Sequence, residues 1–175
     1  MIKKCAAIST IMIIICFVTI SSALAKASQA RTRAGKSNIG HLYLVERDLS
    51  TWDVIPGGAW GKMQYNLSGP EFCFVFNGHG LKIEENYTLI YYPDPWPGNG
   101  LICLGSGVVD EYGNIHIQGY ADTDDLPIET DTNSGAKIWL VLSDDVDCDN
   151  AKMAGWNGAE YLFEYNLITF DDTDE

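Results

Sequence analysis

The sequence predicts an all-β domain, built as an antiparallel two-sheet β-sandwich of the immunoglobulin-like or Greek-key type. Three observations lead to this prediction. After residue 25 no long segment shows the apolar period of a helix, short runs rich in β-branched and aromatic residues recur, and glycine, proline, asparagine or aspartate separates the runs. The length of 175 residues suits one ordinary domain with a real core.

Nine runs are expected to form strands, and alternation of side chains supports several of them. Ile115 and Ile117 fall on one face of their run, and His116 falls on the other. Between residues 161 and 167, large apolar side chains occupy every second position, which is typical of a half-buried strand. The runs FCFVF and IWLVL lack polar positions and are predicted to be central strands. The nine expected strands are 41–46, 52–55, 59–66, 71–76, 87–92, 101–109, 114–120, 136–142 and 160–170.

The connections fit the same plan. Residues 110–114, DEYGN, are predicted to form a hairpin connection in which Gly113 takes a positive φ. Phe74, Trp139 and Phe163 come from three different runs, and we expect all three to face the interior that the two sheets share.

The N-terminal segment predicts export. A short basic start is followed by a mostly apolar, uncharged run, and Ala23-Leu24-Ala25 has the small-x-small pattern of a signal peptidase site. An uncleaved leader that anchors the chain is the alternative, because about 20 apolar residues can span a bilayer. Both alternatives place the domain outside the cytoplasm, secreted or at the cell surface. The expected parts are a signal peptide (1–25), a flexible basic linker (26–39), the β-sandwich (40–170) and an acidic tail (171–175).

The charge of the chain after the linker excludes one class of partner. From Gly40 onward, five lysines and arginines stand against all 24 aspartates and glutamates, which gives a formal charge of −19. Binding of phosphate groups needs clustered lysine and arginine, so no nucleic acid is expected as a partner.

Three cysteines, Cys73, Cys103 and Cys148, remain after the leader. Outside the cytoplasm two of them are expected to form a disulfide. Cys103 and Cys148 each lie near the edge of an apolar run and are predicted to pair. Cys73 lies inside FCFVF and is predicted to be a buried thiol that behaves as a small apolar residue. Three free thiols are the alternative.

Trp96 is the first ligand-binding candidate, because prolines flank it in YYPDPWPGNG and keep its loop out of a sheet. An exposed, rigid indole at this position would offer a stacking platform for a sugar ring. Alternatively, the indole folds back as a lid over the end of the sandwich, and the high average burial of tryptophan favours this alternative. Tyr92 and Trp156 complete the candidate ligand-binding set.

The segment DDVDCDNAKMAGW contains aspartates at alternate positions, as calcium loops do: Asp145, Asp147 and Asp149. The rest of the helical calcium hand is missing, because Asn150 replaces the required glycine and Trp156 replaces the bidentate glutamate. These three aspartates are therefore a weak metal candidate, with a solvated acidic loop as the alternative. A looser calcium site with aspartates of another loop also stays open, namely Asp122, Asp124 or Asp125.

We expect no catalytic residues. The sequence has neither a serine elbow nor an HExxH motif, and its three histidines do not have metal-ligand spacing. Carboxylate pairs for glycoside hydrolysis cannot be assigned among so many acids. Two glycosylation sequons, at Asn66 and Asn86, lie at expected strand ends and are candidate modification sites.

Four strings carry a resemblance: GPEFCFVFNGHGL, YTLIYYPDPWPGNG, GAKIWLVLSDDVDC and GWNGAEYLFEYNLITF. Over roughly residues 40–170 the chain resembles a group of exported, β-rich microbial proteins of unknown function, most of them archaeal. The resemblance implies an exported domain and brings no catalytic residues with it. Cys73 departs from the pattern of the group, which supports the pairing of Cys103 with Cys148.

These observations predict an exported domain without enzymatic activity that has a binding or structural role at the cell surface. The expected partner is a carbohydrate or an envelope protein. No cofactor is expected, and calcium is the only candidate. A small secreted hydrolase that uses acidic residues and a calcium-dependent adhesion module are the alternatives.

Overall fold

The computed structural model describes residues 37–174, and its regular elements are strands and two single turns of 3-10 helix. The longer strands are β1 (Ile39–Val45), β2 (Trp60–Asn66), β4 (Phe72–His79), β5 (Asn86–Tyr92), β6 (Ile102–Val108), β7 (Ile115–Ala121) and β8 (Lys137–Leu142). The short elements are β3 (Ser68–Gly69), η1 (Ser143–Asp145), β9 (Val146–Asp147), β10 (Lys152–Met153), η2 (Gly158–Glu160), β11 (Phe163–Glu164) and β12 (Asp171–Asp172).

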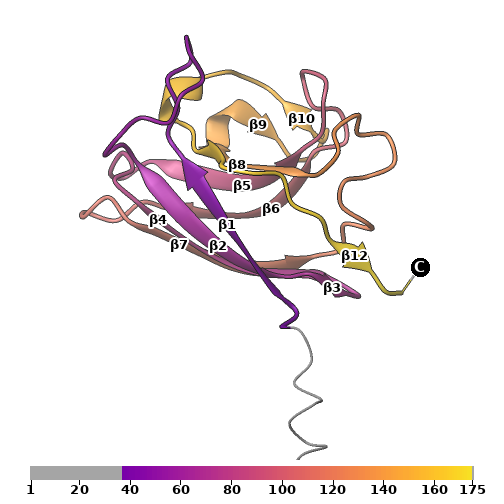
Figure 1. Ribbon diagram of the computed structural model, residues 1–175. Coiled ribbons are helices and arrows are strands. Elements are labelled where there is room, and N and C mark those ends of the chain that lie inside the picture. The colour runs from indigo at the N-terminus through magenta and orange to yellow at the C-terminus, as the bar shows by residue number, and fades with distance from the viewer. Residues whose placement is uncertain (1–36, 175) are drawn as a thin grey trace, which may run out of the picture. The chain divides into compact units, whose positions relative to one another are not determined.

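Most strands belong to two antiparallel sheets. One sheet has five strands in the order β11-β1-β2-β4-β7, and the other has three in the order β6-β5-β8 (Figure 1). Two-stranded pairs, β9 with β10 and β3 with β12, complete the sheet structure of the described residues. The prediction of an all-β domain with antiparallel sheets is confirmed.

One buried cluster joins the inward faces of the two larger sheets. Phe72, Phe74 and Phe76 of β4 are almost fully buried, and they pack with Leu89 and Tyr91 of β5. Complete burial of one such side chain contributes about 2 kcal/mol, so this cluster is the main source of stability. The expected interior position of Phe74 is confirmed.

The alternate positions of β4 face solvent. Cys73 and Val75 are exposed, although β4 lies between β2 and β7 in its sheet. The prediction that Cys73 is a buried thiol is therefore wrong, and FCFVF is central in the sheet without being covered on both faces. Side chains alternate between the faces of a strand, and nothing in the described residues covers the outer face here.

A second buried cluster lies on the other face of β5 and β8. It contains Ile90, Tyr92, Trp139 and Val141 of these strands, together with Phe163 and Tyr161 from the last part of the chain. Strand β8 is thus buried on both faces, as the prediction for IWLVL requires. Trp139 and Phe163 are buried as expected, but they lie in this second cluster and not in the interior that the two sheets share.

Two expected strands do not form as predicted. Residues 52–55 make only one isolated bridge, between Arg47 and Val54, because Trp52 adopts a left-handed backbone with φ of 67°. Residues 160–170 form only the short strand β11. The residues of this range after β11 make only isolated bridges, from Ile168 to Ala136 and from Phe170 to Leu126. Tyr165 and Leu167 are consequently exposed, whereas the alternating pattern placed them on a buried face.

The turn at residues 110–114 forms as expected but joins different sheets. Gly113 has a φ of 78°, and the Asp110 carboxylate accepts hydrogen bonds from the backbone N–H groups of Tyr112 and Asn114. Strand β6 precedes the turn and β7 follows it, and these strands belong to the three-stranded and the five-stranded sheet. The turn is therefore a connection between sheets and not a hairpin within one.

The predicted disulfide is present. Cys103 and Cys148 are bonded, with their Cα atoms 5.8 Å apart and a separation of 45 positions in sequence. A disulfide is consistent with a compartment outside the cytoplasm. Between residues 37 and 174, no helix is long and apolar enough to cross a bilayer.

The ends of the domain differ from the predicted boundaries. Strand β1 begins at Ile39, inside the expected linker, and the rest of that linker up to residue 36 and the expected signal peptide lie outside the described residues. Asp171 and Asp172 pair with β3 as a parallel strand, and the Thr173 N–H donates to the Gly69 carbonyl. The first part of the expected acidic tail is thus hydrogen-bonded to the domain as a strand.

Candidate functional site

Three half-exposed tryptophans lie close together at the loops that follow β1, β5 and β10. Trp52, Trp96 and Trp156 have exposed fractions of 48%, 52% and 44%. Trp96 meets Trp156 edge to face at 5.8 Å between ring centroids. Trp52 and Trp156 both pack on the buried ring of Phe163, at 5.0 and 6.1 Å. We call these three residues the tryptophan row.

Buried aromatic rings support the row from below. Trp156 contacts Trp139 at 6.2 Å and Tyr161 at 5.4 Å, and Trp139 stacks on Tyr92 at 4.0 Å. Tyr92 is only 3% exposed, and burial raises the pKa of its hydroxyl to about 12. Tyr92 was expected to contact ligand directly, but it lies beneath the surface because alternation along β5 points it into the second buried cluster.

The loop that carries Trp96 is held by backbone hydrogen bonds to the loop that precedes Trp156. The Met153 N–H donates to the Pro97 carbonyl at 2.9 Å, and the Gly100 N–H donates to the Ala151 carbonyl at 3.0 Å. The half-exposed indole of Trp96 contradicts the lid, which was the favoured alternative. Proline keeps this loop out of the sheet, as expected, and the loop presents the indole to solvent.

Asp145 fixes the segment that carries Trp156. Its buried carboxylate accepts hydrogen bonds from the Tyr161 hydroxyl at 2.6 Å and from the Asn157 amide at 2.8 and 2.9 Å. Its backbone carbonyl accepts from the N–H groups of Ala154 and Gly155. Burial, together with this bond to Asp145, raises the pKa of Tyr161 above its usual range. Asp145 is therefore a structural anchor.

The metal site predicted at the three alternating aspartates does not form in the described residues. The Asp147 carboxylate accepts hydrogen bonds from the Asn150 backbone and side chain, which lowers the Asp147 pKa, and Asp149 is exposed. Asp145 is committed to Tyr161 and Asn157, Asp147 is committed to Asn150, and among the described residues the three carboxylates do not form a group that could hold a metal ion.

Two further residues of the site, Arg47 and Glu164, are not recognisable from the sequence. The Arg47 guanidinium donates to the Trp52 carbonyl and to the Glu164 carbonyl, both at 2.9 Å, and so ties the Trp52 loop to β11. The Glu164 carboxylate accepts a hydrogen bond from the Trp139 indole N–H at 2.5 Å. Burial raises the pKa of Glu164 to about 7, against the opposing effects of Trp139, Lys137 and Arg47. Lys137 also pairs with Asp94, next to the Trp96 loop.

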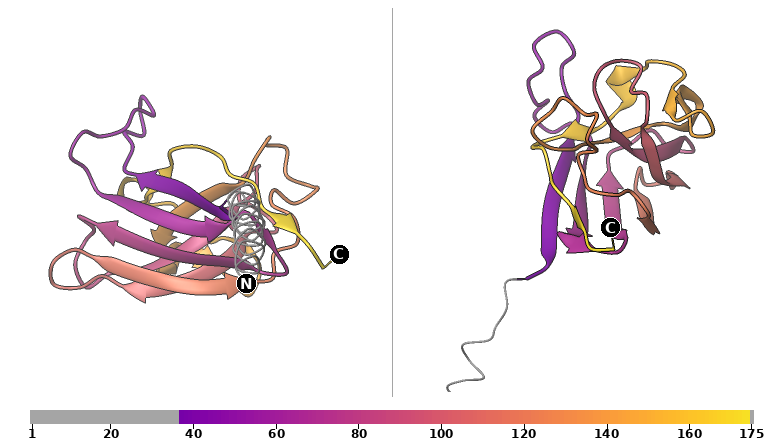
Figure 2. Two further views of the ribbon diagram at one scale, coloured as in Figure 1. Left: turned by 60° about the horizontal axis from the view of Figure 1, so that its bottom comes forward. Right: turned by 90° about the vertical axis from the view of Figure 1, so that its right-hand side faces the viewer.

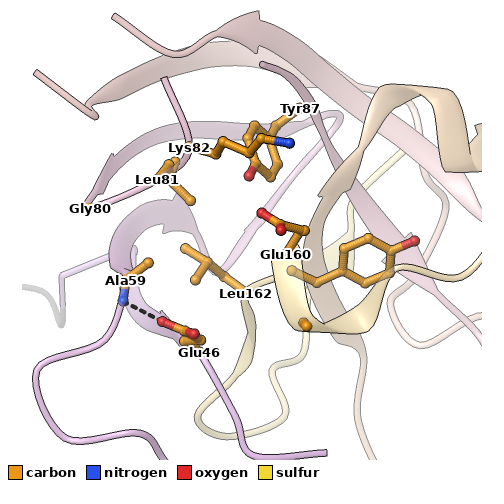
Figure 3. Close-up of a pocket in the computed structure, with 10 residues that line it drawn as sticks. Glu46, Ala59, Gly80, Leu81, Lys82, Tyr87, Glu160 and Leu162 are labelled. Atoms are coloured by element: carbon orange, nitrogen blue, oxygen red, sulfur yellow. Dashed lines mark hydrogen bonds between the residues drawn. The ribbon is translucent and has the colours of Figure 1, made fainter. Parts of the chain in front are cut away.

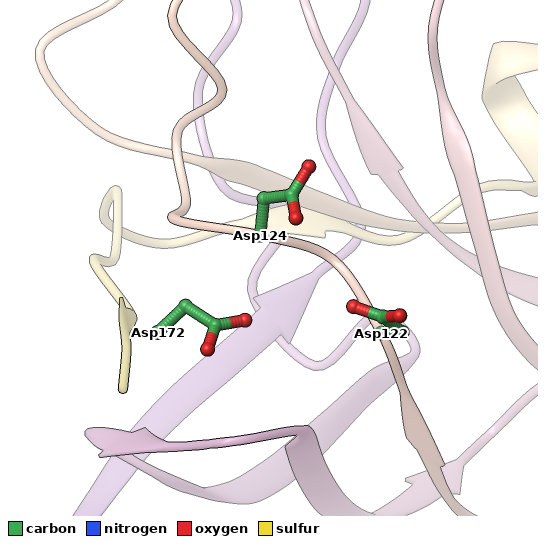
Figure 4. Close-up of side chains that lie close together, drawn as sticks. All are labelled: Asp122, Asp124 and Asp172. Carbon is green, nitrogen blue, oxygen red and sulfur yellow. The ribbon is translucent and has the colours of Figure 1, made fainter. Parts of the chain in front are cut away.

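A group of carboxylates lies elsewhere on the surface. Oxygen atoms of Asp122, Asp124 and Asp172 all lie within 4.8 Å of one another (Figure 4). Asp122 and Asp124 were part of the looser calcium candidate. Its remaining aspartate, Asp125, is not in this group, and its carboxylate accepts a hydrogen bond from the Asp172 N–H at 2.7 Å. Exposed acidic groups commonly cluster without a metal ion, so this group alone does not define a site.

A small pocket lies between the ends of β1, β2 and β4 and the η2 turn, lined by Glu46, Lys82, Tyr87 and Glu160 among others (Figure 3). Its volume is about 80 Å³, whereas pockets for small ligands usually measure about 300–1,000 Å³. The Glu46 carboxylate accepts a hydrogen bond from the Ala59 N–H at 2.8 Å. The pocket is therefore too small for a usual ligand, and the Glu46 carboxylate in its wall stabilises the adjoining loop.

The two candidate glycosylation sites have different surroundings. The Asn66 amide N–H₂ donates to the carbonyls of Ser68 and Glu71, and its oxygen accepts from the Cys73 N–H. A glycan on Asn66 would remove at least one of these hydrogen bonds. Asn86 is exposed at the start of β5, so it is the more accessible of the two candidate residues.

Comparisons of the chain with protein-family models, with curated proteins and with solved structures found no match. The functional interpretation therefore rests on the geometry described above.

Proposed function

We propose that this protein is an exported, non-enzymatic β domain that binds carbohydrate through the tryptophan row. The observation that carries the proposal is the arrangement of three half-exposed indoles from three separate loops: Trp52 and Trp156 pack on the same buried ring of Phe163, and Trp96 packs on Trp156. Contiguous exposed apolar surface on a soluble domain commonly marks an interaction site. Membership of the exported group that the chain resembles stays a prediction.

The chemistry of the row suits a sugar. A sugar ring has an apolar face of C–H groups and a polar edge of hydroxyl groups, and an indole offers a broad apolar face to the former. Backbone hydrogen bonds and the Asp145 contacts hold the Trp96 and Trp156 loops in place before any ligand arrives. Little conformational entropy is then lost on binding. Asp94 and Lys137, beside the Trp96 loop, are suitable partners for the hydroxyl groups.

An immunoglobulin-like or Greek-key sandwich is the finer architecture that we propose for the two sheets. The buried cluster shared by their inward faces supports it. Loops gather at the ends of such a sandwich, where recognition residues are often found. Figure 2 shows the loop after β1, which carries Trp52, extending beyond the ends of the strands.

A glycan array with the purified protein tests the proposal. We expect binding to one class of glycan, and we expect Trp96→Ala and Trp156→Ala each to weaken it at least about tenfold, as for aromatic residues at the centre of an interface. Tyr112→Ala is the matched control, because Tyr112 is 77% exposed on the turn between β6 and β7. Glycan binding that survives both tryptophan substitutions, or no glycan binding at all, contradicts the proposal.

A protein partner would produce a different result. Sedimentation of the protein over a range of concentrations would then show self-association that Trp96→Ala abolishes, with no bound glycan on the array. This combination would assign the row to a protein interface.

The environment of Glu164 supports a second candidate function, glycoside hydrolysis. A carboxyl group whose pKa is raised to about 7 by burial is suited to donate a proton to a leaving group. Such hydrolysis also needs a second carboxylate, at about 5–10 Å from the first. Hydrolysis of a sugar polymer that binds the row, lost in Glu164→Gln with binding retained, would favour the enzyme over the binding domain.

A further inference from the structure

The outer face of the five-stranded sheet carries side chains in rows that cross the strands. The pairing registers place Tyr43, Lys62, Asn77 and His116 beside one another, each on the outward position of its strand. The next row contains His41, Gln64, Val75 and Gln118. We call the outward side of β1, β2, β4 and β7 the open face.

The open face differs in charge from the rest of the domain. None of its four strands contains an aspartate or a glutamate, although the chain has 24 of them. All three histidines of the chain, His41, His79 and His116, lie in these strands. Lys62 is also there, and in the described part of the chain its ammonium group has no carboxylate partner within ion-pair distance. The four strands of the face thus carry no acidic side chain on a strongly acidic protein.

One end of the open face is hollowed. The hollow has a volume of about 410 Å³ and is lined by Tyr43, Trp60, Lys62, Gln64, Asn77 and His79. This volume falls within the range of about 300–1,000 Å³ that is usual for small ligands.

Two aromatic rings form the apolar part of the hollow. Trp60 and Tyr43 are each about half exposed, and their centroids lie 6.4 Å apart with the planes tilted by 35°. The Trp60 ring also packs against the His79 ring, with 4.9 Å between the ring centroids. The Lys62 ammonium lies 5.7 Å from the centre of the Tyr43 ring, so the positive charge stands directly beside the aromatic surface.

Polar groups in the hollow keep hydrogen-bonding capacity. The Asn77 side-chain oxygen is bonded to the His116 ring, which leaves the exposed amide N–H₂ of Asn77 as a donor. The His79 ring is oriented by a hydrogen bond of 2.7 Å between its Nδ1 atom and the Asn114 side-chain oxygen, so Nε2 is free for a ligand. Gln64 is exposed on the same side of β2.

From this arrangement we infer that the open face is a second binding site, specific for an acidic saccharide. The ring of the sugar packs on Trp60, its carboxylate or sulfate group pairs with Lys62, and its hydroxyl groups bond to Asn77, Gln64 and His79. Charge complementarity supports this occupant, because an anion would be repelled from most of the surface and accepted where acids are absent. A single lysine does not suit nucleic acid, which requires clustered positive charge.

Calorimetric titration of the full protein with two acidic probes tests the inference: an oligogalacturonate and a heparin-derived hexasaccharide. We expect at least one of them to bind. The methyl ester of the oligogalacturonate and a desulfated hexasaccharide are the matched neutral probes, and these should bind at least about fivefold more weakly, the loss expected for one exposed ion pair. Added salt should reduce the difference, since it screens charges.

Substitutions assign the binding to the open face. Trp60→Ala should abolish detectable binding of the acidic probe, and Lys62→Gln should weaken it about fivefold, to the level of the neutral probe. Lys82→Gln is the control for loss of a positive charge, because Lys82 is exposed and pairs with Glu85. Trp96→Ala should leave binding of the acidic probe unchanged, which separates this inference from the proposed function of the tryptophan row.

Several results would overturn the inference. These are the failure of both acidic probes to bind, equal binding of the neutral probes, and binding that Lys62→Gln leaves unchanged. Equally strong binding of a single-stranded oligonucleotide would also overturn it, because the face would then recognise polyanions in general. Circular dichroism of Trp60→Ala checks that loss of binding is not loss of the fold.

Discussion

The tryptophan row and the open face both expose aromatic rings, but different forces hold the rings in place. On the open face, strand pairing sets the positions, so that Tyr43 lies opposite Lys62 because β1 and β2 pair in that register. In the row, three loops meet, and a few side chains hold them: Arg47 binds the Trp52 loop and Asp145 binds the Trp156 segment. A sheet has many equivalent hydrogen bonds, whereas a set of loops depends on single contacts.

This difference predicts unequal stability. Local opening costs least free energy where few contacts must break. Damage to the loop contacts should therefore disturb the row and leave the open face intact. Hydrogen exchange of backbone amides, followed separately in residues 143–160 and in β1, β2 and β4, measures both regions in one experiment.

Loss of the disulfide should have the largest effect. Cys103 and Cys148 close a loop of 45 residues that includes β8 and the start of the Trp156 segment. In the double variant Cys103→Ser/Cys148→Ser, the chain-entropy model predicts a loss of about 4 kcal/mol in the free energy of unfolding. Urea unfolding measures this loss. Amide exchange should accelerate most in residues 143–160, and equal acceleration in β1, β2 and β4 would contradict the proposed difference between the regions.

Asp145→Ala should have the next largest effect. The substitution leaves the buried Tyr161 hydroxyl and the Asn157 amide without their acceptor, which should lower the free energy of unfolding by about 3 kcal/mol. Asp147→Ala is the matched control, because the Asp147 carboxylate serves an exposed turn, and it should cost less than about 1 kcal/mol. Urea unfolding of both variants checks the prediction. Equal losses would show that Asp145 is not the anchor of the row.

Glu164 should make stability depend on pH near neutrality. Its pKa is about 7 in the folded protein and 4.5 as the ordinary value, so the folded state holds the proton more strongly. The stabilisation is complete below about pH 4.5 and is lost as pH rises through 7. The shift corresponds to at most about 3 kcal/mol, and partial exposure reduces this to about 2 kcal/mol.

Unfolding by urea at pH 5, 6, 7 and 8 measures this effect in the wild type and in Glu164→Gln. The variant cannot lose a proton at residue 164, so its stability should fall less than that of the wild type between pH 5 and 8. Both proteins contain the same histidines, and the difference between the two curves therefore isolates Glu164. Parallel curves would show that the carboxylate is better solvated than the structure indicates.

The sequence was sufficient to predict the positions of most of the longer strands, whether their partners are near or distant in sequence. Strands β1, β2, β5, β7 and β8 begin and end within two residues of their expected positions, because alternation and turn residues are local signals. Which face of a strand is covered is not a local property. Burial of the outer side of β4 would require a further layer from a distant part of the chain, and an apolar run such as FCFVF gives no information about that layer.

The candidate site was predictable only in part, for the same reason. Trp96 and Trp156 stand out as large residues in loops, and the structure brings them together. Trp52 joins them through its contact with the Phe163 ring and through Arg47, whose guanidinium reaches the Glu164 carbonyl, 117 residues away in sequence. The spacing of the alternating aspartates resembled that of a calcium loop. The spacing could not reveal that the Asp145 carboxylate is bound by Tyr161, which lies 16 residues further along the chain.

Cys73 gives the smallest expected effect and the sharpest test of the open face. Its thiol is exposed on β4, so Cys73→Ser should change the free energy of unfolding by less than about 0.5 kcal/mol, whereas a buried thiol would cost about 1 kcal/mol or more. The exposed thiol should also react rapidly with a thiol reagent in the folded protein. Under air oxidation the wild type should form a disulfide-linked dimer on a non-reducing gel, and Cys73→Ser should not. A thiol that reacts only after unfolding would show that another part of the chain or a second molecule covers this face, and that the region without acids is an interface and not a site for a saccharide.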